Sequence, residues 1–498
     1  MRYFILLILI QGISGVQGVS AQDMDSTSIK QIDSLIQISK SYTLKRNFDS
    51  AFVLIATADS IAVDHKGKPT LSNASIYFNK GMIYFEKQDY KQSEKYLLQA
   101  TTIYKNILGD QHPYYANCLK NLSNLYFEIG NYSKAEELNL EEKAIRKNAL
   151  ASNPFEYITC LNNLAGVYQA TGKYSNAEEI TIEAKVVCEE SLGKQHPEYV
   201  KILNNLAIIY FNIADYERAE PLFKEAMNIR ELSFGRQHPD FAASLNNLAL
   251  LYETMGNYDL AEPMYLESKS IIEMVYGTEH SDYVMCLHNL SALYWSMGKF
   301  EKAEPLNLEA KQIIELTLGK EHPDYANSLN NLATLYQTLG NYAKAELFYL
   351  EAVRIREKIL GKQHPDYAYS LNSLATLYKQ MGKTERAEQL YFEILQIMEG
   401  SVGKNHPYYA LGMHNLANLY FESSKTDQAE KYFKQAIDIR KKSLGKRHPD
   451  YALVLNDLAG LKMSQGKYIV AEKLYKEVLD IQKEALGTEH PNYTNTLK

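Results

Sequence analysis

Histidine is the residue type in this chain most suited to acid–base or metal chemistry, and its spacing decides how it is interpreted. The chain has 12 histidines in 498 residues, and eight of them stand directly before proline. Together with His280 they are separated by 42 residues or a multiple of 42: His112, His196, His238, His280, His322, His364, His406, His448 and His490. A catalytic residue has no reason to recur in every unit of a periodic chain. We therefore interpret these nine histidines as linker and capping residues.

The other residues capable of chemistry also fall into the repeat or stand alone. His65 is isolated, while His288 and His414 share one repeat position. Cys118, Cys160 and Cys286 share another, which indicates small core residues, with a Cys118–Cys160 bridge as the alternative. The sequence contains no HExxH, glycine-rich phosphate loop or GxSxG motif. We predict no catalytic residue, no metal site, no cofactor and no enzymatic activity.

The 42-residue unit itself predicts two helices. In the unit that begins at His322, Tyr325, Leu329, Leu332 and Tyr336 form one apolar stripe at helical spacing, which ends at Gly340. A second stripe precedes Gly361, where a left-handed cap favours glycine; it consists of Tyr342, Ala345, Tyr349, Ala352, Ile355 and Ile359. A hairpin with one apolar face cannot bury that face alone, so neighbouring units must stack. We predict an all-α superhelix of about eleven helical hairpins over residues 28–487, with residues 488–498 starting a further, incomplete repeat.

The segments LNNLATLYQTLGNYAKAE and LG-x-x-HPDYA resemble the 42-residue tetratricopeptide repeats (TPR) of kinesin light chains and their bacterial relatives. The resemblance covers nearly all of the chain after residue 27. It implies a right-handed solenoid whose first helices line the concave side and which binds protein or peptide. Kinesin light chains carry a coiled coil before the repeats, which is missing here, so motor binding is not implied.

One asparagine position stands out within the first helix of each unit. By resemblance to superhelical TPR proteins, including the O-GlcNAc transferases, it faces the groove and can form a ladder along a bound peptide. The position is occupied by Asn121, Asn163, Asn205, Asn247, Asn289, Asn331 and Asn415. The alternative is that each amide bonds a neighbouring helix or loop, because buried amides need partners in either case.

Aromatic residues recur one turn further along the first helix, as Phe127, Phe211, Trp295 and Phe421. On a concave surface such residues are plausible anchors for ligand side chains, and we single out Phe211 and Trp295. The alternative is packing between units.

The N-terminal segment predicts export. Met1 to Ala21 combines a basic Arg2, a short apolar run and a small-residue end, which is typical of a cleavable signal peptide; a short N-terminal anchor is the alternative. Residues 22–27 are a short linker, and the mature protein is expected in the periplasm or outside the cell. No later apolar stretch approaches about 20 residues, so we expect no membrane insertion after cleavage. The mixed charge, net −7, argues against nucleic acid as a ligand.

Two functions follow from these patterns. The first is a non-enzymatic interaction scaffold that binds extended peptide or protein segments in the concave groove. The alternative is the sensory or regulatory region of a larger protein whose effector, a CHAT-type protease or a signalling kinase, lies beyond Lys498. Self-stacking of the solenoid ends is a third option. The sequence leaves the partner, the pathway and the oligomeric state open.

Overall fold

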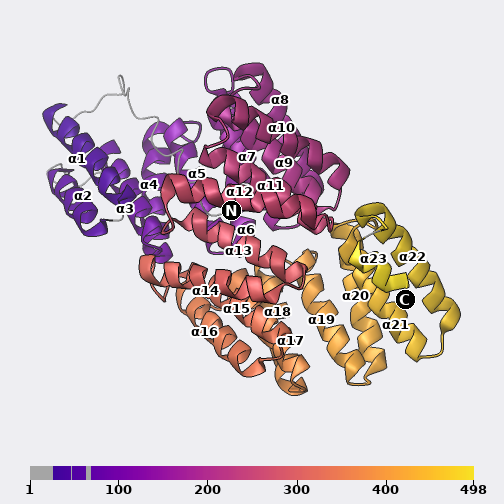
Figure 1. The fold of residues 1–498 in the computed structure, drawn as a ribbon. Helices are drawn as coiled ribbons and strands as arrows, with labels where there is room; N and C mark the ends of the chain where they lie inside the picture. Colours follow the sequence, from indigo (N-terminus) through magenta and orange to yellow (C-terminus); the bar gives the residue numbers. More distant parts are fainter. Residues whose placement is uncertain (1–25, 46, 63–68, 489, 498) are drawn as a thin grey trace. The chain divides into compact units, whose positions relative to one another are not determined.

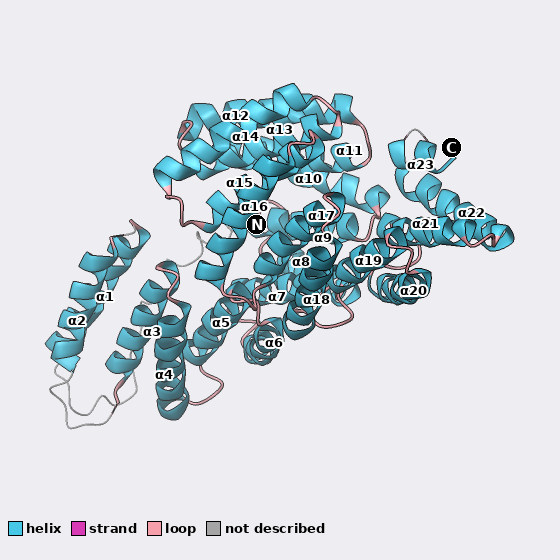
Figure 2. Ribbon diagram, turned by 90° about the horizontal axis from the view of Figure 1, so that it is seen from below, coloured by secondary structure: helices cyan, strands magenta, loops and turns pink. Residues whose placement is uncertain are grey.

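The computed structural model describes residues 26–45, 47–62, 69–488 and 490–497. These residues form 23 helices and no strand, which confirms the all-α prediction (Figures 1 and 2). The predicted signal peptide lies outside the described residues, as does His65. The chain divides into two compact units, Met1–Leu125 and Tyr126–Lys498, called unit 1 and unit 2 below.

Unit 1 contains two helical hairpins and most of a fifth helix. The helices are α1 (Ser26–Leu44), α2 (Phe48–Ala62), α3 (Leu71–Glu86), α4 (Tyr90–Leu108) and α5 (Pro113–Glu128), which crosses the unit boundary. Helix α1 packs against α2, and α3 packs against α4. The core of the first hairpin includes Ile32, Ile36 and Ile55, all nearly inaccessible to solvent.

Unit 2 continues the same pattern to its end. Its helices are α6 (Tyr132–Asn148), α7 (Pro154–Ala170), α8 (Tyr174–Ser191), α9 (Pro197–Asn212), α10 (Tyr216–Phe234), α11 (Pro239–Thr254), α12 (Tyr258–Tyr276), α13 (Ser281–Ser296), α14 (Phe300–Thr317), α15 (Pro323–Thr338), α16 (Tyr342–Leu360), α17 (Pro365–Gln380), α18 (Thr384–Ser401), α19 (Pro407–Glu422), α20 (Thr426–Ser443), α21 (Pro449–Ser464), α22 (Tyr468–Leu486) and α23 (Pro491–Leu497). Helices α1 to α22 make up eleven pairs, as predicted. Below, the two helices of a pair are called the first and the second helix.

The His-Pro dipeptide begins the first helix of most repeats. His322 is the N-cap of α15, and its Nδ1 accepts a hydrogen bond of 3.2 Å from the backbone N–H of Asp324. Pro323 follows at the first helical position, where its missing N–H would have no partner in the helix. One unit has Asn153-Pro154 in place of His-Pro, and there Asn153 accepts from the backbone N–H of Glu156 instead. The interpretation of these histidines as caps is confirmed.

The turn between the two helices of a hairpin requires a left-handed backbone. Gly340 and Gly382 stand at this position with φ of 75° and 71°. Ala214 and Ser424 occupy the same position with φ of 59° in each case, although a side chain disfavours this conformation. These two turns therefore carry local strain that the glycine-containing turns avoid.

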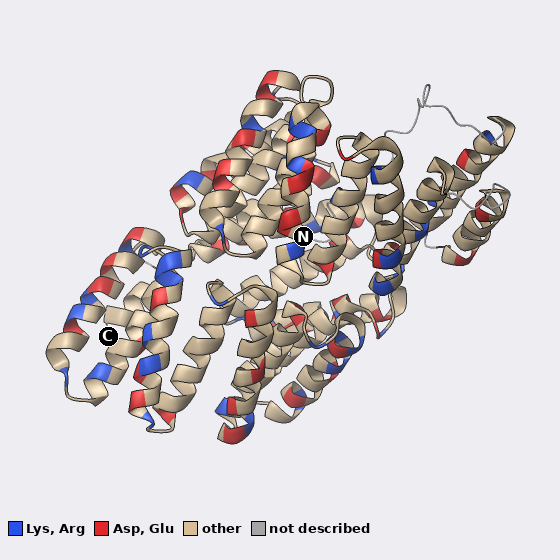
Figure 3. Ribbon diagram, turned by 180° about the vertical axis from the view of Figure 1, so that it is seen from behind, with Lys and Arg blue, Asp and Glu red and all other residues tan. Residues whose placement is uncertain are grey.

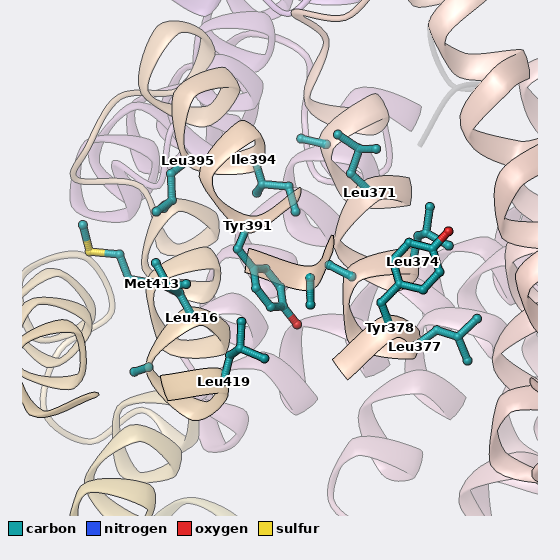
Figure 4. Close-up of a cluster of buried hydrophobic side chains, with 14 of the residues drawn as sticks. Leu371, Leu374, Leu377, Tyr378, Tyr391, Ile394, Leu395, Met413, Leu416 and Leu419 are labelled. Carbon is teal, nitrogen blue, oxygen red and sulfur yellow. The ribbon is translucent and has the colours of Figure 1, made fainter. Parts of the chain in front are cut away.

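The core lies between the stacked hairpins. Tyr391 of α18 is fully buried and lies between Leu374 of α17 and Leu416 of α19 (Figure 4). The recurring alanine of the second helix, for example Ala387, is also fully buried, and its small side chain allows neighbouring helices to approach closely.

All four cysteines are buried and free, so the alternative of a Cys118–Cys160 bridge is wrong. Burying the thiol raises the pKa of Cys118 to about 12.

Neighbouring hairpins are also joined by a recurring tyrosine–glutamate bond. The hydroxyl of Tyr252 in α11 donates to Glu220 of α10 over 2.7 Å. Tyr294 and Tyr336 make the equivalent bonds in the next two repeats, to glutamates of α12 and α14. Each bond has an ionised acceptor, which strengthens it relative to a neutral pair. The tyrosines that the sequence placed in the core thus also fix each first helix on the preceding repeat.

Repeats that are distant in sequence contact each other within unit 2. The Nε2 atom of His364 lies 2.9 Å from the carbonyl oxygen of Glu128. In the same way, the Nε2 atom of His448 lies 3.0 Å from the carbonyl oxygen of Asn212. Both pairs are 236 residues apart, between five and six repeat lengths. His406 bonds the backbone of Ala170 at the same interval. We call this row of contacts the turn-to-turn seam, because one turn of the superhelix meets the next there.

The seam determines the protonation of its histidines. Nδ1 of His448 accepts from the backbone N–H of Asp450 over 2.9 Å, so the proton of the neutral ring lies on Nε2 and is donated to Asn212. A second proton on Nδ1 would face an N–H group. Burial lowers the pKa of His448, and it lowers the pKa of His406 to about 4.

We predict that Ala214→Gly stabilises the protein by about 0.5–1 kcal/mol, because glycine adopts the left-handed turn without the steric cost of a Cβ atom. Urea unfolding followed by circular dichroism measures the change. Ala249→Gly is the control, because Ala249 lies inside α11 and should lose at least about 1 kcal/mol. Equal destabilisation by both substitutions would contradict the strain at position 214.

We also predict that stability falls as the pH is lowered from about 6.5 to about 4. In this window the unfolded chain protonates His406 at its ordinary pKa of about 6.5, whereas the folded chain, with a pKa of about 4, does not. The unfolded state therefore binds more protons, and stability rises with pH by up to about 3 kcal/mol for this residue. Urea midpoints of the wild type and His406→Asn, compared across this range, measure the effect. The variant retains a capping side chain and should show a shallower pH dependence; identical pH profiles would refute the assignment.

Candidate functional site

The first helices form the inner layer of the solenoid in unit 2. Successive first helices contact each other directly, in the pairs α7–α9, α11–α13, α13–α15, α15–α17, α17–α19 and α19–α21. Among the helices that the structure describes, successive second helices do not reach comparable contact. In a curved stack the layer with the closer neighbours lies on the inside, so the first helices line the concave face, which repeat proteins commonly use for binding.

Side chains on this face form hydrogen bonds from one repeat to the next. Trp295 Nε1 donates to Thr338 Oγ1 over 3.1 Å, and Gln337 Nε2 donates to Gln380 Oε1 over 2.8 Å. Lys379 Nζ reaches Glu422 over 2.8 Å in the following repeat. We call this row, from α13 to α19, the groove row. Its polar side chains are held in place before any ligand arrives.

The predicted asparagines differ in their bonding. Asn205 and Asn247 each donate over 3.4 Å to an amide oxygen of the preceding repeat, and Asn415 donates over 2.7 Å to Asn372. These three bonds match the alternative in which the asparagines join neighbouring helices. In unit 1, Asn121 is buried and donates to the carbonyl of Asn117 in its own helix.

The other three predicted asparagines have no protein hydrogen bond in the described part of the chain. Asn163 and Asn289 are half-buried, and Asn331 is exposed on α15. Their amides have both donors and acceptors available. The asparagines that do bond a protein group still have a second amide N–H to donate. A side-chain amide has two N–H groups, and each of these bonds uses one.

The predicted aromatic anchors include one accessible side chain and two that pack against the core. Trp295 is 44% exposed, and its bond to Thr338 fixes the ring edge while leaving much of the indole accessible. Phe211 is half-buried, packs against the core and lies 5.8 Å from the ring of Tyr216, measured between ring centroids. Phe421 also packs against the core. Trp295 therefore suits the role of an anchor, whereas Phe211 and Phe421 fit the packing alternative.

A cavity of about 300 Å³ lies beside Trp295. Its lining comes from α13, α15, α16 and α17 and consists of Trp295, Thr334, Gln337, Thr338, Tyr349, Asn372, Ser373, Thr376 and Gln380. Tyr349 was predicted only as a core residue, yet its hydroxyl reaches this cavity and donates to Gln337 Oε1 over 2.8 Å. In this recess, amide and hydroxyl groups surround one exposed indole.

The two remaining histidines bond within the first-helix layer. His288 Nε2 lies 3.1 Å from Ser328 Oγ, and burial lowers the pKa of His288 to about 4. His414 Nε2 lies 2.7 Å from Asp457 Oδ2, a partner that sequence reasoning missed because Asp457 stands 43 residues away. Burial lowers the pKa of His414. Both rings bond side chains of the next repeat, so these two histidines join neighbouring repeats and have a structural role.

The described residues give no sign of a metal or membrane-spanning site. Among them, no group of three or more His, Cys, Asp or Glu side chains is placed to hold a metal ion. No described helix combines the length and hydropathy needed to cross a membrane. Basic and acidic residues alternate along the same helices, as Figure 3 shows.

Comparison with known families identifies the same kind of repeat along most of the chain. Family models described as tetratricopeptide repeat match residues 72–148, 157–232, 240–310, 293–358, 348–399 and 387–442, and a second such model matches residues 452–492. These segments cover most of the chain. A comparison with curated proteins gave no match.

Solved structures also match parts of the chain. The kinesin light chain-type protein of Podosopora anserina, with nearly identical TPR-like repeats, is 26% identical over 41% of this chain and 97% of its own, with a TM-score of 0.36. BtubC from P. vanneervenii is 25% identical over 47% of this chain and 92% of its own, with a TM-score of 0.38. A Rap protein in complex with competence and sporulation factor is 16% identical over 74% of this chain and 98% of its own, with a TM-score of 0.50. This last likeness concerns the fold alone.

We predict that Asn415→Ala and Asn331→Ala differ in their cost to stability. Asn415→Ala leaves Asn372 without its donor and should lower the free energy of unfolding by about 1 kcal/mol. Asn331 is exposed and bonds no group of the described part of the chain, so Asn331→Ala should stay within about 0.5 kcal/mol of the wild type. Urea unfolding measures both variants. Equal losses would show that the two asparagines have the same structural role.

Proposed function

Because the chain belongs to the tetratricopeptide repeat family, whose repeats typically mediate protein–protein interaction, we propose that it is a non-enzymatic scaffold that binds an extended peptide or protein segment on its concave face. The observation that supports this most is the groove row, with the cavity of about 300 Å³ beside Trp295. It offers fixed polar groups and one accessible aromatic ring on the same surface.

The chemistry of the groove suits a peptide backbone. A carboxamide is both donor and acceptor, so it can pair with the N–H and C=O groups that every peptide presents. Packed repeats advance by roughly 8–10 Å, whereas an extended peptide advances about 3.3 Å per residue. One asparagine per repeat would then meet the backbone at about every third residue. Such contacts place weak demands on sequence.

Preference among peptides would come from the cavity. The exposed face of Trp295 suits an apolar or aromatic ligand side chain, and the surrounding glutamine and threonine groups suit a polar neighbour. The hydrogen bonds among Gln337, Gln380 and Tyr349 hold the wall in position, so little side-chain order is lost on binding.

We predict that Asn247→Ala, Asn289→Ala and Asn331→Ala together reduce peptide capture at least tenfold while the thermal transition stays nearly in place. The probe is a displayed library of unstructured 12-residue peptides, followed by affinity measurement on the peptides that the wild type selects. Within the described residues, Asn247 alone of the three bonds a protein group, over a long 3.4 Å, so the triple variant should keep its fold.

The matched control changes three exposed positions on the second helices. The control variant combines Leu266→Ala on α12, Leu308→Ala on α14 and Leu350→Ala on α16. Each of these leucines is between 43% and 45% exposed. This variant should keep the wild-type affinity. Failure of the wild type to select any peptide, or undiminished binding by the asparagine triple variant, would overturn the proposed function.

A further inference from the structure

Glu253 is a carboxylate on the concave face that meets no cation among the described residues. It stands on α11, at the repeat position that Trp295 and Gln337 occupy in the next two repeats. Its side chain is half-buried. Tyr265 donates its hydroxyl to Glu253 Oε2 over 3.0 Å, and Ser296 donates to Oε1 over 3.2 Å. Both partners are neutral, so they hold the carboxylate in place without compensating its charge.

Other charged side chains of this face are paired from one repeat to the next. Lys379, which occupies the same repeat position as Glu253, lies 2.8 Å from Glu422. Burial raises the pKa of Glu253, and the hydrogen bonds from Tyr265 and Ser296 oppose this rise. A cation beside a carboxylate favours its ionised form and offsets the cost of burying it. A basic group that reaches Glu253 would therefore be stabilised there.

The surface beside Glu253 suits the stem of a long basic side chain. Leu250 lies three residues earlier on α11, on the same side of the helix, and is 45% exposed. Leu250 and Glu253 are the repeat equivalents of Thr334 and Gln337, which line the cavity beside Trp295. Lysine and arginine lay their methylene groups on apolar surface and keep the charged head at a polar group. An exposed leucine next to a carboxylate matches that combination.

Trp295 lies one repeat further along the groove. Ser296, its neighbour in the chain, is the residue that bonds Glu253, so the carboxylate lies where α11 meets α13. Packed repeats advance by roughly 8–10 Å, and an extended peptide advances about 3.3 Å per residue. Glu253 and the indole therefore meet ligand residues that are about three positions apart.

We propose that the bound peptide carries a lysine or arginine that pairs with Glu253, about three residues from the apolar or aromatic residue that packs on Trp295. The carboxylate oxygens can accept this bond, because Tyr265 and Ser296 use one acceptor site on each oxygen. The inference rests on the proposed peptide binding and adds the chemical class of the ligand. Glu253 selects the charge of the peptide, and Trp295 selects the neighbouring apolar residue.

The repeat itself supplies the substitutions that test this role. Gln337 accepts the hydroxyl of Tyr349 just as Glu253 accepts that of Tyr265, so Glu253→Gln should keep the hydrogen bond and remove only the charge. Lysine stands at the equivalent position as Lys379, so Glu253→Lys reverses the charge at a position where the fold accommodates lysine. Circular dichroism verifies that both variants are folded.

Peptides are selected from the displayed library of 12-residue sequences on the wild type and on each variant, and the affinities of the selected peptides are measured in solution. The wild type should enrich lysine or arginine at the stated spacing from an apolar residue. Replacing that basic residue of the peptide by glutamine should weaken binding to the wild type about tenfold, because a charge-assisted hydrogen bond is lost. The same replacement should leave binding to Glu253→Gln nearly unchanged. Glu253→Lys should instead enrich aspartate or glutamate at that position of the peptide.

Glu422→Gln is the matched control, because it removes the same charge from the same face at a carboxylate that Lys379 already pairs. It should keep the wild-type preference for a basic residue. Wild-type peptides without a basic residue, an unchanged preference in Glu253→Gln, or an equal loss of preference in Glu422→Gln would each overturn this inference and leave the peptide-binding proposal standing. A wild type that selects no peptide would overturn both proposals.

Discussion

The structure depends on one constraint: a helical hairpin with a single apolar face cannot bury that face by itself. Tyr391 illustrates the solution, because it is fully buried only through contact with the helices before and after it in the stack. The concave face exists because first helices approach more closely than second helices, and the seam exists because the curvature brings later repeats back to earlier ones.

Much of the fold was predictable because its determinants are local. The positions of Leu332, Tyr336 and Ala345 within one unit are enough to place them in the core, and all three are buried. The cap role of the His-Pro histidines also followed from repetition alone. The helix pairs were therefore expected in number and in register.

The seam could not be predicted from the repeat. It pairs residues 236 apart, and that interval depends on the rise and rotation per repeat, which no local pattern states. The partner of His414 was missed for a similar reason, since Asp457 replaces an asparagine of the next unit. At the candidate site, the sequence identified the asparagine position but could not tell which amides would pair with one another, because the distances between neighbouring helices decide this.

Site-specific cross-linking tests most directly whether an extended ligand occupies the concave face. A photoreactive residue at Gln337, which lines the cavity, is compared with one at Leu350 on a second helix of the same repeat. With a peptide selected by the wild type, we expect a cross-linked product from position 337 and none from position 350. Equal cross-linking at both positions, or a product only from position 350, would place the ligand elsewhere and contradict the claim.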